Sequence, residues 1–134
     1  MATALAVKLL NQPGSVASAS GAIGRANVNI RAVAGFINDK SGEVRFITDD
    51  PEAAERALKA EGFLVRKIEV LIVPVSNTPG ELALLAERLS NSGIILDGLY
   101  LSASANGEGI EVVFEAPDVA AARRALSRIM APAV

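Results

Sequence analysis

The segment Asn11-Gln12-Pro13-Gly14 occurs a second time, with one substitution, as Asn77-Thr78-Pro79-Gly80. The same offset of 66 residue numbers, from 11 to 77, relates many apolar positions. Leu5, Val7 and Leu9 correspond to Leu71, Val73 and Val75, and Val16, Ala19 and Ile23 correspond to Leu82, Leu85 and Leu89. A gap-free period of this kind indicates tandem copies of one folding unit. The sequence therefore predicts two small repeats, residues 1–69 and 70–134.

The predicted elements follow the same order in both repeats. Alternating apolar residues at 5, 7 and 9 predict a strand, and apolar spacing after Gly14 predicts a helix over 14–24 that buries Val16, Ala19 and Ile23. Further strands are expected over 28–33, 43–48, 63–68, 70–75, 94–100 and 110–114, with turns at 38–42 and 106–109. The order strand–helix–strand–strand–helix–strand predicts an α+β, ferredoxin-like fold, in which an antiparallel sheet carries both helices on one face.

The helix ends have recognisable signals. Asn27 aligns with Gly93, and both residue types readily adopt the left-handed conformation that closes a helix C-terminus. Asp50 before Pro51 is the pattern of an N-cap followed by proline in the first turn, and the second copy of this helix is expected to open at Pro117. The apolar phase of this last helix drifts by about two residues between the repeats.

Only four residues follow Met130, so we expect the fourth strand of repeat 2 to be missing or vestigial. The fourth strand of repeat 1, by contrast, continues without punctuation into the first strand of repeat 2. An unfinished sheet leaves backbone groups unpaired, and proteins cover such edges. We expect the edge to be completed by the segment 63–76 of the other repeat or by a second subunit, which predicts a homodimer.

The composition excludes several classes of function. The chain has no histidine and no cysteine, which removes the commonest general base, the thiolate nucleophile and most transition-metal ligands. We therefore expect no enzyme activity, no catalytic residues, no metal and no cofactor. A net charge of −2 gives no electrostatic reason to bind nucleic acid or an anionic membrane. The N-terminus lacks the features of a signal peptide, so a cytoplasmic location is expected.

The order of elements, the Asn-x-Pro-Gly turn after the first strand and the segment Ala26-Asn-Val-Asn-Ile30 resemble the ACT domain. The resemblance covers essentially the whole chain and is greatest to small stand-alone proteins made of two such domains. It implies a protein that binds a free amino acid at interfaces between paired modules and transmits the binding event to a partner, such as a biosynthetic enzyme acting in trans.

The residues around the repeated turn suit an amino acid. Pro13 and Gly14 set a tight turn that leaves the N–H groups of Ser15 and Val16 at a helix N-terminus, where a carboxylate is favoured. The resemblance implies polar ligand contacts at Asn11 and Asn29, whose two amides together would hold both ends of the molecule. In repeat 2 the corresponding candidates are Asn77 and Gly80, for which we expect the same roles.

Repeat 2 departs from repeat 1 at two of these positions. Ile95 stands where Asn29 would be, which leaves a second equivalent site open. Asp97, in an otherwise apolar segment, is the best candidate for binding the ligand ammonium. It aligns with Arg31, so the two repeats carry opposite charges at one position and would pair or divide the charged ends of a ligand between them.

Structural interpretations of the same residues stay open. Asn11 and Asn77 can be turn caps that satisfy the local backbone, Asn29 can face solvent, and Asp97 can be a surface strand residue. Three functions follow: an amino-acid-sensing regulatory module, a ligand-free assembly subunit acting through protein–protein contacts, and an RNA-binding sheet. The third lacks the aromatic and basic face that base stacking requires.

Overall fold

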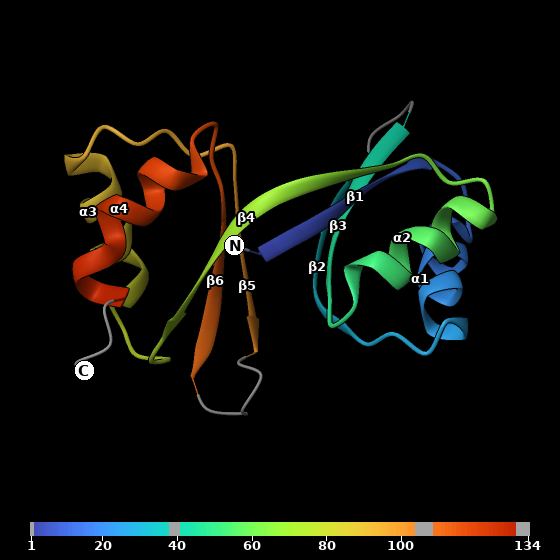
Figure 1. Ribbon diagram of the computed structural model, residues 1–134, viewed down its shortest axis with the longest axis horizontal. Helices are drawn as coiled ribbons and strands as arrows, with labels where there is room; N and C mark the ends of the chain where they lie inside the picture. The colour runs from blue at the N-terminus through green and yellow to red at the C-terminus, as the bar shows by residue number, and fades with distance from the viewer. Residues whose placement is uncertain (1, 38–40, 104–108, 131–134) are drawn as a thin grey trace. The chain divides into compact units, whose positions relative to one another are not determined.

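The computed structural model describes residues 2–37, 41–103 and 109–130 (Figure 1). Within them the protein is α+β, with antiparallel strands and four helices. The chain divides into two compact units, one of residues 3–68 and one of residues 69–134 together with the first two residues. We call them the N-terminal and the C-terminal unit.

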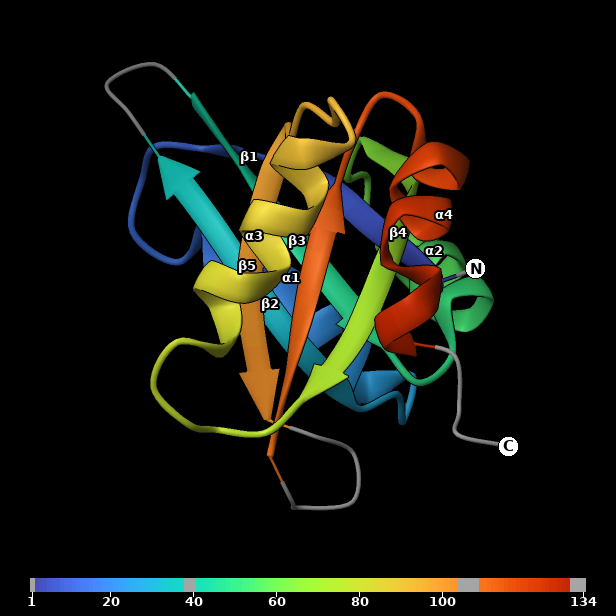
Figure 2. The same ribbon diagram turned by 90° about the vertical axis from the view of Figure 1, so that its left-hand side faces the viewer.

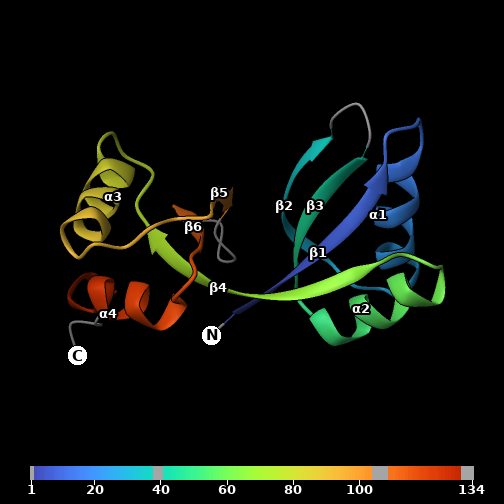
Figure 3. The ribbon, with the colours of Figure 1, turned by 90° about the horizontal axis from the view of Figure 1, so that it is seen from above.

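The N-terminal unit contains a sheet of strand order β2-β3-β1-β4. Its elements are β1 (Ala2–Leu10), α1 (Ser15–Arg25), β2 (Ile30–Ile37), β3 (Ser41–Thr48), α2 (Pro51–Ala60) and the beginning of β4 (Val65–Val75). The central strand β3 is antiparallel to both neighbours, with Phe46 opposite Leu5 on β1 and opposite Val33 on β2. Both helices lie on the same side of these strands (Figure 3). The predicted ferredoxin-like order is therefore present in this unit.

The core of the N-terminal unit lies between the sheet and its two helices. Alternate residues of β1 and β3 supply one side, and apolar residues of α1 and α2 supply the other. The buried members are Leu5, Val7, Leu9, Ala19, Ala22, Ile23, Val28, Val44, Phe46, Ala54 and Leu58. Because the side-chain period of a strand is two, this alternation fixes which face of the sheet the helices cover.

The C-terminal unit repeats the arrangement with its own core. It contains the later part of β4, α3 (Glu81–Asn91), β5 (Gly98–Ala103), β6 (Ile110–Glu115) and α4 (Val119–Met130), with strand order β4-β6-β5. Both helices cover one face of these strands (Figure 2). The core side chains are Leu71, Val73, Leu85, Leu89, Val112, Phe114, Val119, Ala122 and Leu126. Residues 65–75 form one strand, where the sequence predicts two consecutive strands over 63–68 and 70–75.

Three of the predicted helix-end signals are confirmed. Asn27 and Gly93 both have positive φ, 60° and 72°, and each closes its helix. The N–H of the following residue, Val28 or Ile94, bonds back to the carbonyl of Ile23 or Leu89, as in a Schellman motif. Asp50 accepts a hydrogen bond from Ala53 N at 3.1 Å and caps α2.

Several details of the predicted elements are wrong. Strand β2 covers Ile30–Ile37 instead of residues 28–33. Val16 is 43% exposed, and Ala22 is buried on α1 in its place. Helix α4 begins at Val119 instead of Pro117, because Asp118 caps it by accepting from Ala121 N at 2.9 Å. This later cap accounts for the drift of the apolar phase. Strand β5 begins at Gly98 instead of Ile94, because residues 94 and 96 pack against the core without joining the ladder.

Some predictions fall outside the described residues. The predicted turns at 38–42 and 106–109 include residues 38–40 and 106–108, which are not described, and a vestigial fourth strand would lie in 131–134. The completion of the open edge by another chain stays a prediction.

An ion-pair cluster links β3 to β4 in the N-terminal unit. Glu43 accepts from Arg66 Nη2 at 3.0 and 3.2 Å and is also paired with Arg45. Burial acts to raise the pKa of Glu43, but the hydrogen bonds and charges of the two arginines outweigh it and hold the pKa below its ordinary value of 4.5. The ionised carboxylate therefore stabilises the fold, and this contribution is lost as the pH falls from 4.5 through the folded-state pKa.

The Glu43→Gln variant should lose up to about 1 kcal/mol of unfolding free energy at pH 7, since the side chain is partly exposed and solvent screens the pairs. The difference from the wild type should shrink as the pH is lowered below about 4.5. Urea denaturation at several pH values measures it. Glu69→Gln, at an exposed carboxylate, is the control. An undiminished difference at low pH would argue against this role of the cluster.

Candidate functional site

The turn between β1 and α1 is a compact hydrogen-bonded loop. Gln12 N donates to Leu10 O at 2.9 Å, and Gly14 follows with φ of 89° as the N-cap of α1. Ser15 Oγ lies 2.7 Å from Leu10 O and 3.1 Å from Gln12 O, so its hydroxyl donates back across the turn. The positive φ requires glycine, because a Cβ would strain this conformation.

The C-terminal unit reproduces the same backbone at the same offset. Thr78 N donates to Ser76 O at 2.9 Å, and Leu84 N donates to Gly80 O at 3.0 Å, just as Ser18 N donates to Gly14 O at 2.8 Å. The φ of Gly80 is 88°, matching Gly14. The repeated sequence therefore encodes one turn geometry twice.

The two helix starts differ in charge. Neither Gly14 nor Gly80 offers a side chain to cap the first helical N–H groups, and the first turn of α1 contains no acidic residue. In α3 the residue that corresponds to Ser15 is Glu81, which places a carboxylate in the first turn. A helix N-terminus attracts negative charge. The start of α3 thus has a carboxylate of its own, whereas the start of α1 does not.

The two amides expected to meet a ligand are not equally placed. Ser15 N lies 3.4 Å from Gln12 O and turns back into the loop, which the sequence did not reveal. The backbone N–H of Val16, by contrast, has no hydrogen-bond acceptor among the described residues. Pro13 is exposed beside them.

Asn11 and Asn77 are exposed at the same place in the two turns. In the parts of the chain that the structure describes, neither side chain makes a hydrogen bond to another residue. In repeat 1 it is Ser15 that bonds the local backbone. Ligand contact by these two asparagines stays a prediction.

The structure does not bring Asn11 and Asn29 together within the N-terminal unit. Asn11 follows Leu10, which lies opposite Ser41, and Asn29 precedes Ile30, which lies opposite Thr48. Seven residue steps of β3 separate those ends, or roughly 20 Å. The backbone of exposed Asn29 is instead engaged by Asp49, whose N–H and Oδ1 each bond to it at 3.1 Å. A site that uses both asparagines needs them from different modules.

Asp97 is exposed and precedes β5. Its backbone N–H donates to Glu115 O at 2.7 Å, which places Asp97 beside the end of β6. Asn77 follows β4, whose last residue Val75 lies opposite Ile110 at the start of β6. These positions lie at opposite ends of β6, roughly 15 Å apart. Within this unit the two candidates therefore cannot contact one small ligand. Ile95, at the position of Asn29, is 72% exposed.

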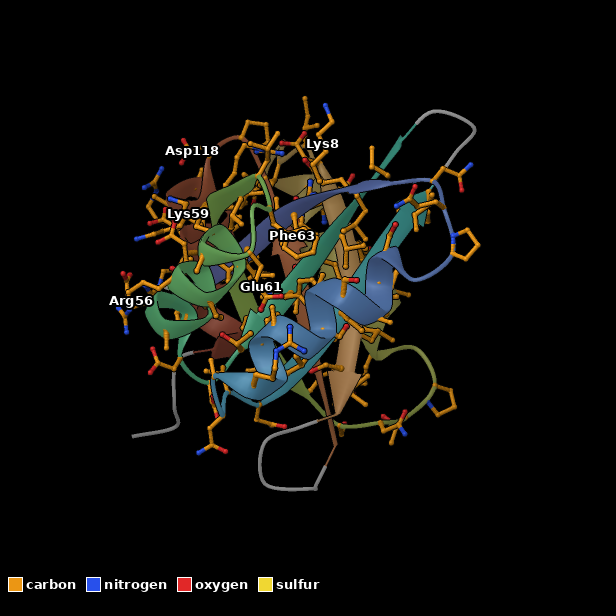
Figure 4. All side chains as sticks on the ribbon, turned by 90° about the vertical axis from the view of Figure 1, so that its right-hand side faces the viewer. Lys8, Arg56, Lys59, Glu61, Phe63 and Asp118 are labelled. Carbon is orange, nitrogen blue, oxygen red and sulfur yellow. The ribbon has the colours of Figure 1, made fainter. Side chains whose placement is uncertain are left out.

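A cavity of about 450 Å³ adjoins the turn in the N-terminal unit. It lies where β1 ends, α1 begins and the chain leaves α2 for β4; Phe63 and Glu61 are seen beside α1, with Lys8 above them (Figure 4). The lining residues are Lys8, Leu9, Leu10, Gln12, Ser15, Ser18, Glu61, Gly62, Phe63 and Leu64. Of the residues predicted to form a site, the cavity includes Ser15. The sequence alone does not reveal the other lining residues, because residues 61–64 are far from the turn in sequence and come close to it only in the folded chain.

One wall of this cavity is held by an ion pair between α1 and the end of α2. Arg25 Nη2 donates to both carboxylate oxygens of Glu61, at 2.7 and 2.8 Å. The hydrogen bond to Glu61, together with its charge, raises the pKa of the Arg25 guanidinium above its ordinary value. The pair fixes the position of Glu61 at the cavity.

The described residues also bear on metal binding and on membrane insertion. Residues 2–37, 41–103 and 109–130 contain no group of three or more His, Cys, Asp or Glu placed to hold a metal ion. None of the helices in these ranges is long and apolar enough to cross a membrane.

Comparison with solved structures identifies the fold. The regulatory subunit of aspartate kinase from Thermus thermophilus matches with a TM-score of 0.67 and 17% identity, over 95% of this chain and 91% of that one. Aspartate kinase from Synechocystis matches with a TM-score of 0.63 and 17% identity, over 96% of this chain but 25% of the enzyme. The described residues thus have an ACT-like fold.

A higher similarity is found to protein BT0572 from Bacteroides thetaiotaomicron. Its TM-score is 0.86 at 27% identity, over 96% of this chain and 88% of that one. No protein-family model and no curated protein matches the sequence.

Proposed function

We propose that the protein is a non-catalytic regulatory module made of two tandem ACT repeats, residues 1–69 and 70–134, that binds a small free amino acid. The observation that carries the proposal is the duplicated strand-to-helix turn, with a left-handed glycine at each helix start and no side-chain cap. Such a start favours an anionic group. The fold shared with regulatory subunits of aspartate kinase supports the same conclusion.

The proposed contacts follow from the turn. The ligand carboxylate is bound at Gly14, Ser15 and Val16 beside Pro13 and Asn11. A second module supplies Asn29, since the first cannot bring it to the same place. In the C-terminal unit Asn77 and Gly80 would have the equivalent role. Glu81 disfavours a ligand at this second turn, because its carboxylate repels the carboxylate of the ligand. Asp97 would bind an ammonium only from another module.

Paired modules also require a surface for assembly. Val33, Phe36 and Ile37 on β2 are 53%, 86% and 43% exposed, and Leu99 and Leu101 on β5 are 45% and 49% exposed. These strands end the strand order of their units, so they offer both apolar side chains and unpaired backbone groups. They support the proposed homodimer and the proposed contact with a partner enzyme in trans. The proposed location is the cytoplasm.

A thermal-shift screen of the twenty amino acids tests the function. A ligand at a hundred times its dissociation constant adds about 2.7 kcal/mol to the folded state, so at least one amino acid should raise the melting temperature in a saturable manner. The matching 2-hydroxy acid, which lacks the ammonium group, is the control and should shift it less.

The second candidate function is a ligand-free assembly subunit. The exposed apolar residues of β2 and β5, together with Glu81 and Ile95 at the positions of Ser15 and Asn29, favour it. It predicts that no amino acid shifts the melting temperature, while light scattering still detects a dimer. That pair of results would replace the sensor proposal by the assembly proposal.

A further inference from the structure

We infer that the cavity of the N-terminal unit binds the amino acid, that the ligand has an apolar side chain, and that each chain has one such pocket. This inference rests on the proposed function and specifies its ligand and its location. The cavity is lined wholly by residues between 8 and 64, so it belongs to one unit. Its volume of about 450 Å³ falls within the roughly 300–1,000 Å³ of small-molecule sites.

The charged groups around the cavity suit a ligand that carries a carboxylate. Lys8 and Glu61 are the two charged residues among its lining residues. Lys8 has no ion-pair partner among the residues the structure describes, and Glu61 is fixed by Arg25. The unmatched charge of the lining is therefore that of Lys8, which a ligand carboxylate would balance, whereas an ammonium would bind the remaining lone pairs of Glu61 and neutral oxygens of the lining.

The hydrogen-bonding groups lie on the side of the turn and α1. Ser15 uses its hydroxyl hydrogen on the turn carbonyls, which leaves its oxygen as an acceptor. Gln12 and Ser18 add an amide and a hydroxyl. These groups can both donate to a carboxylate and accept from an ammonium, as the main-chain end of an amino acid requires.

The rest of the lining is apolar and selects the side chain. Leu9 is buried, Phe63 packs against the core, and Leu10 and Leu64 are 63% and 70% exposed at the rim. With the charges of the lining matched to the main-chain groups, a third charge on the ligand would face these four side chains without a partner. Desolvating such a charge is costly, so acidic and basic amino acids are disfavoured. An aliphatic side chain instead gains by covering the exposed leucines.

The corresponding positions of the C-terminal unit do not repeat this chemistry. At the offset of 66, Lys8 becomes Pro74, Ser15 becomes Glu81 and Ser18 becomes Leu84. The cation is lost, a carboxylate is gained, and a bulky side chain replaces the small hydroxyl. The same turn backbone therefore occurs twice, with only one pocket chemistry suited to a zwitterion.

The test exchanges one residue between the repeats and uses the full chain. Ser18→Leu introduces the residue found at 84 into the cavity, at an exposed position of α1 where leucine favours the helix. Leu84→Ser makes the reverse change at a 46% exposed site and is the matched control. Titration calorimetry with leucine, valine, aspartate and lysine measures affinity and stoichiometry, and thermal unfolding without ligand confirms that both variants fold.

We expect leucine or valine to bind the wild type more tightly than aspartate or lysine, with one site per chain. Ser18→Leu should weaken that affinity about tenfold or more by filling the pocket, and Leu84→Ser should leave it unchanged. If an amino acid binds equally well to Ser18→Leu, or if a charged amino acid binds best, the inference is wrong while the proposed function stands. If no amino acid binds the wild type, both are wrong.

Discussion

Replacing Phe46 by alanine is expected to lower the unfolding free energy of the N-terminal unit by about 3–5 kcal/mol. Phe46 is fully buried on β3, opposite Leu5 of β1 and Val33 of β2, within the core beneath α1 and α2. Removing the ring takes away both its transfer free energy and the contacts that fill the space between sheet and helices. Chemical denaturation followed by circular dichroism measures the loss.

The chain provides a matched control for this substitution. Phe36→Ala makes the same change on the neighbouring strand β2, where the side chain is 86% exposed. It should alter the unfolding free energy by less than about 0.5 kcal/mol, as surface substitutions do. Equal losses at the two positions would mean that β3 does not bury Phe46 against the helices.

Gly14→Ala is expected to destabilise the protein by about 1–2 kcal/mol, although the new methyl group meets nothing within 4 Å. The loss comes from the backbone, because φ of 89° is strained for any residue with a Cβ. Gly24→Ala adds the same methyl group inside α1, also with nothing within 4 Å, and should stabilise by up to about 1 kcal/mol. Denaturation of both variants compares the two signs.

The same glycine substitutions separate stability from binding. Gly80→Ala should destabilise as much as Gly14→Ala, since the two φ values agree within a degree. Only Gly14→Ala should also weaken amino-acid binding, because Gly14 adjoins the cavity of the N-terminal unit. A stabilising effect of Gly14→Ala would contradict the left-handed turn, and equal losses of affinity would place a working site in both repeats.

The sequence predicts much of the fold because its signals are local. Alternating apolar residues locate β1. The alignment of Asn27 with Gly93 locates two helix ends, because each end depends on the backbone conformation of a single residue. The α4 start was misplaced because Pro117 and Asp118 both carry initiating chemistry, and only the hydrogen bond to Ala121 N distinguishes them. The sequence predicts a buried Val16 where the structure buries Ala22, because several small residues of α1 fit the same helical period.

The candidate site was less predictable because it depends on distance through space. Asn11 and Asn29 are close in sequence order, yet the register of β3 puts them at opposite ends of the sheet. The cavity combines residues near 8–18 with residues 61–64, and no sequence spacing encodes that contact. The repeat alignment does contain a signal that the two sites differ. Ser18 in α1 aligns with Leu84 in α3, whereas Gly14 aligns with Gly80.

The most direct test of the account is an amide chemical-shift titration of the isotopically labelled protein with the amino acid that binds best. The account predicts saturable shifts at Ser15 and Ser18 and at Gly62 to Leu64, which line the cavity, and at Gly14, which precedes Ser15 in the turn. The equivalent amides from Gly80 to Leu84 should move far less. Unchanged amides around Gly14 under saturating ligand would contradict the proposal that this turn and its cavity bind the effector.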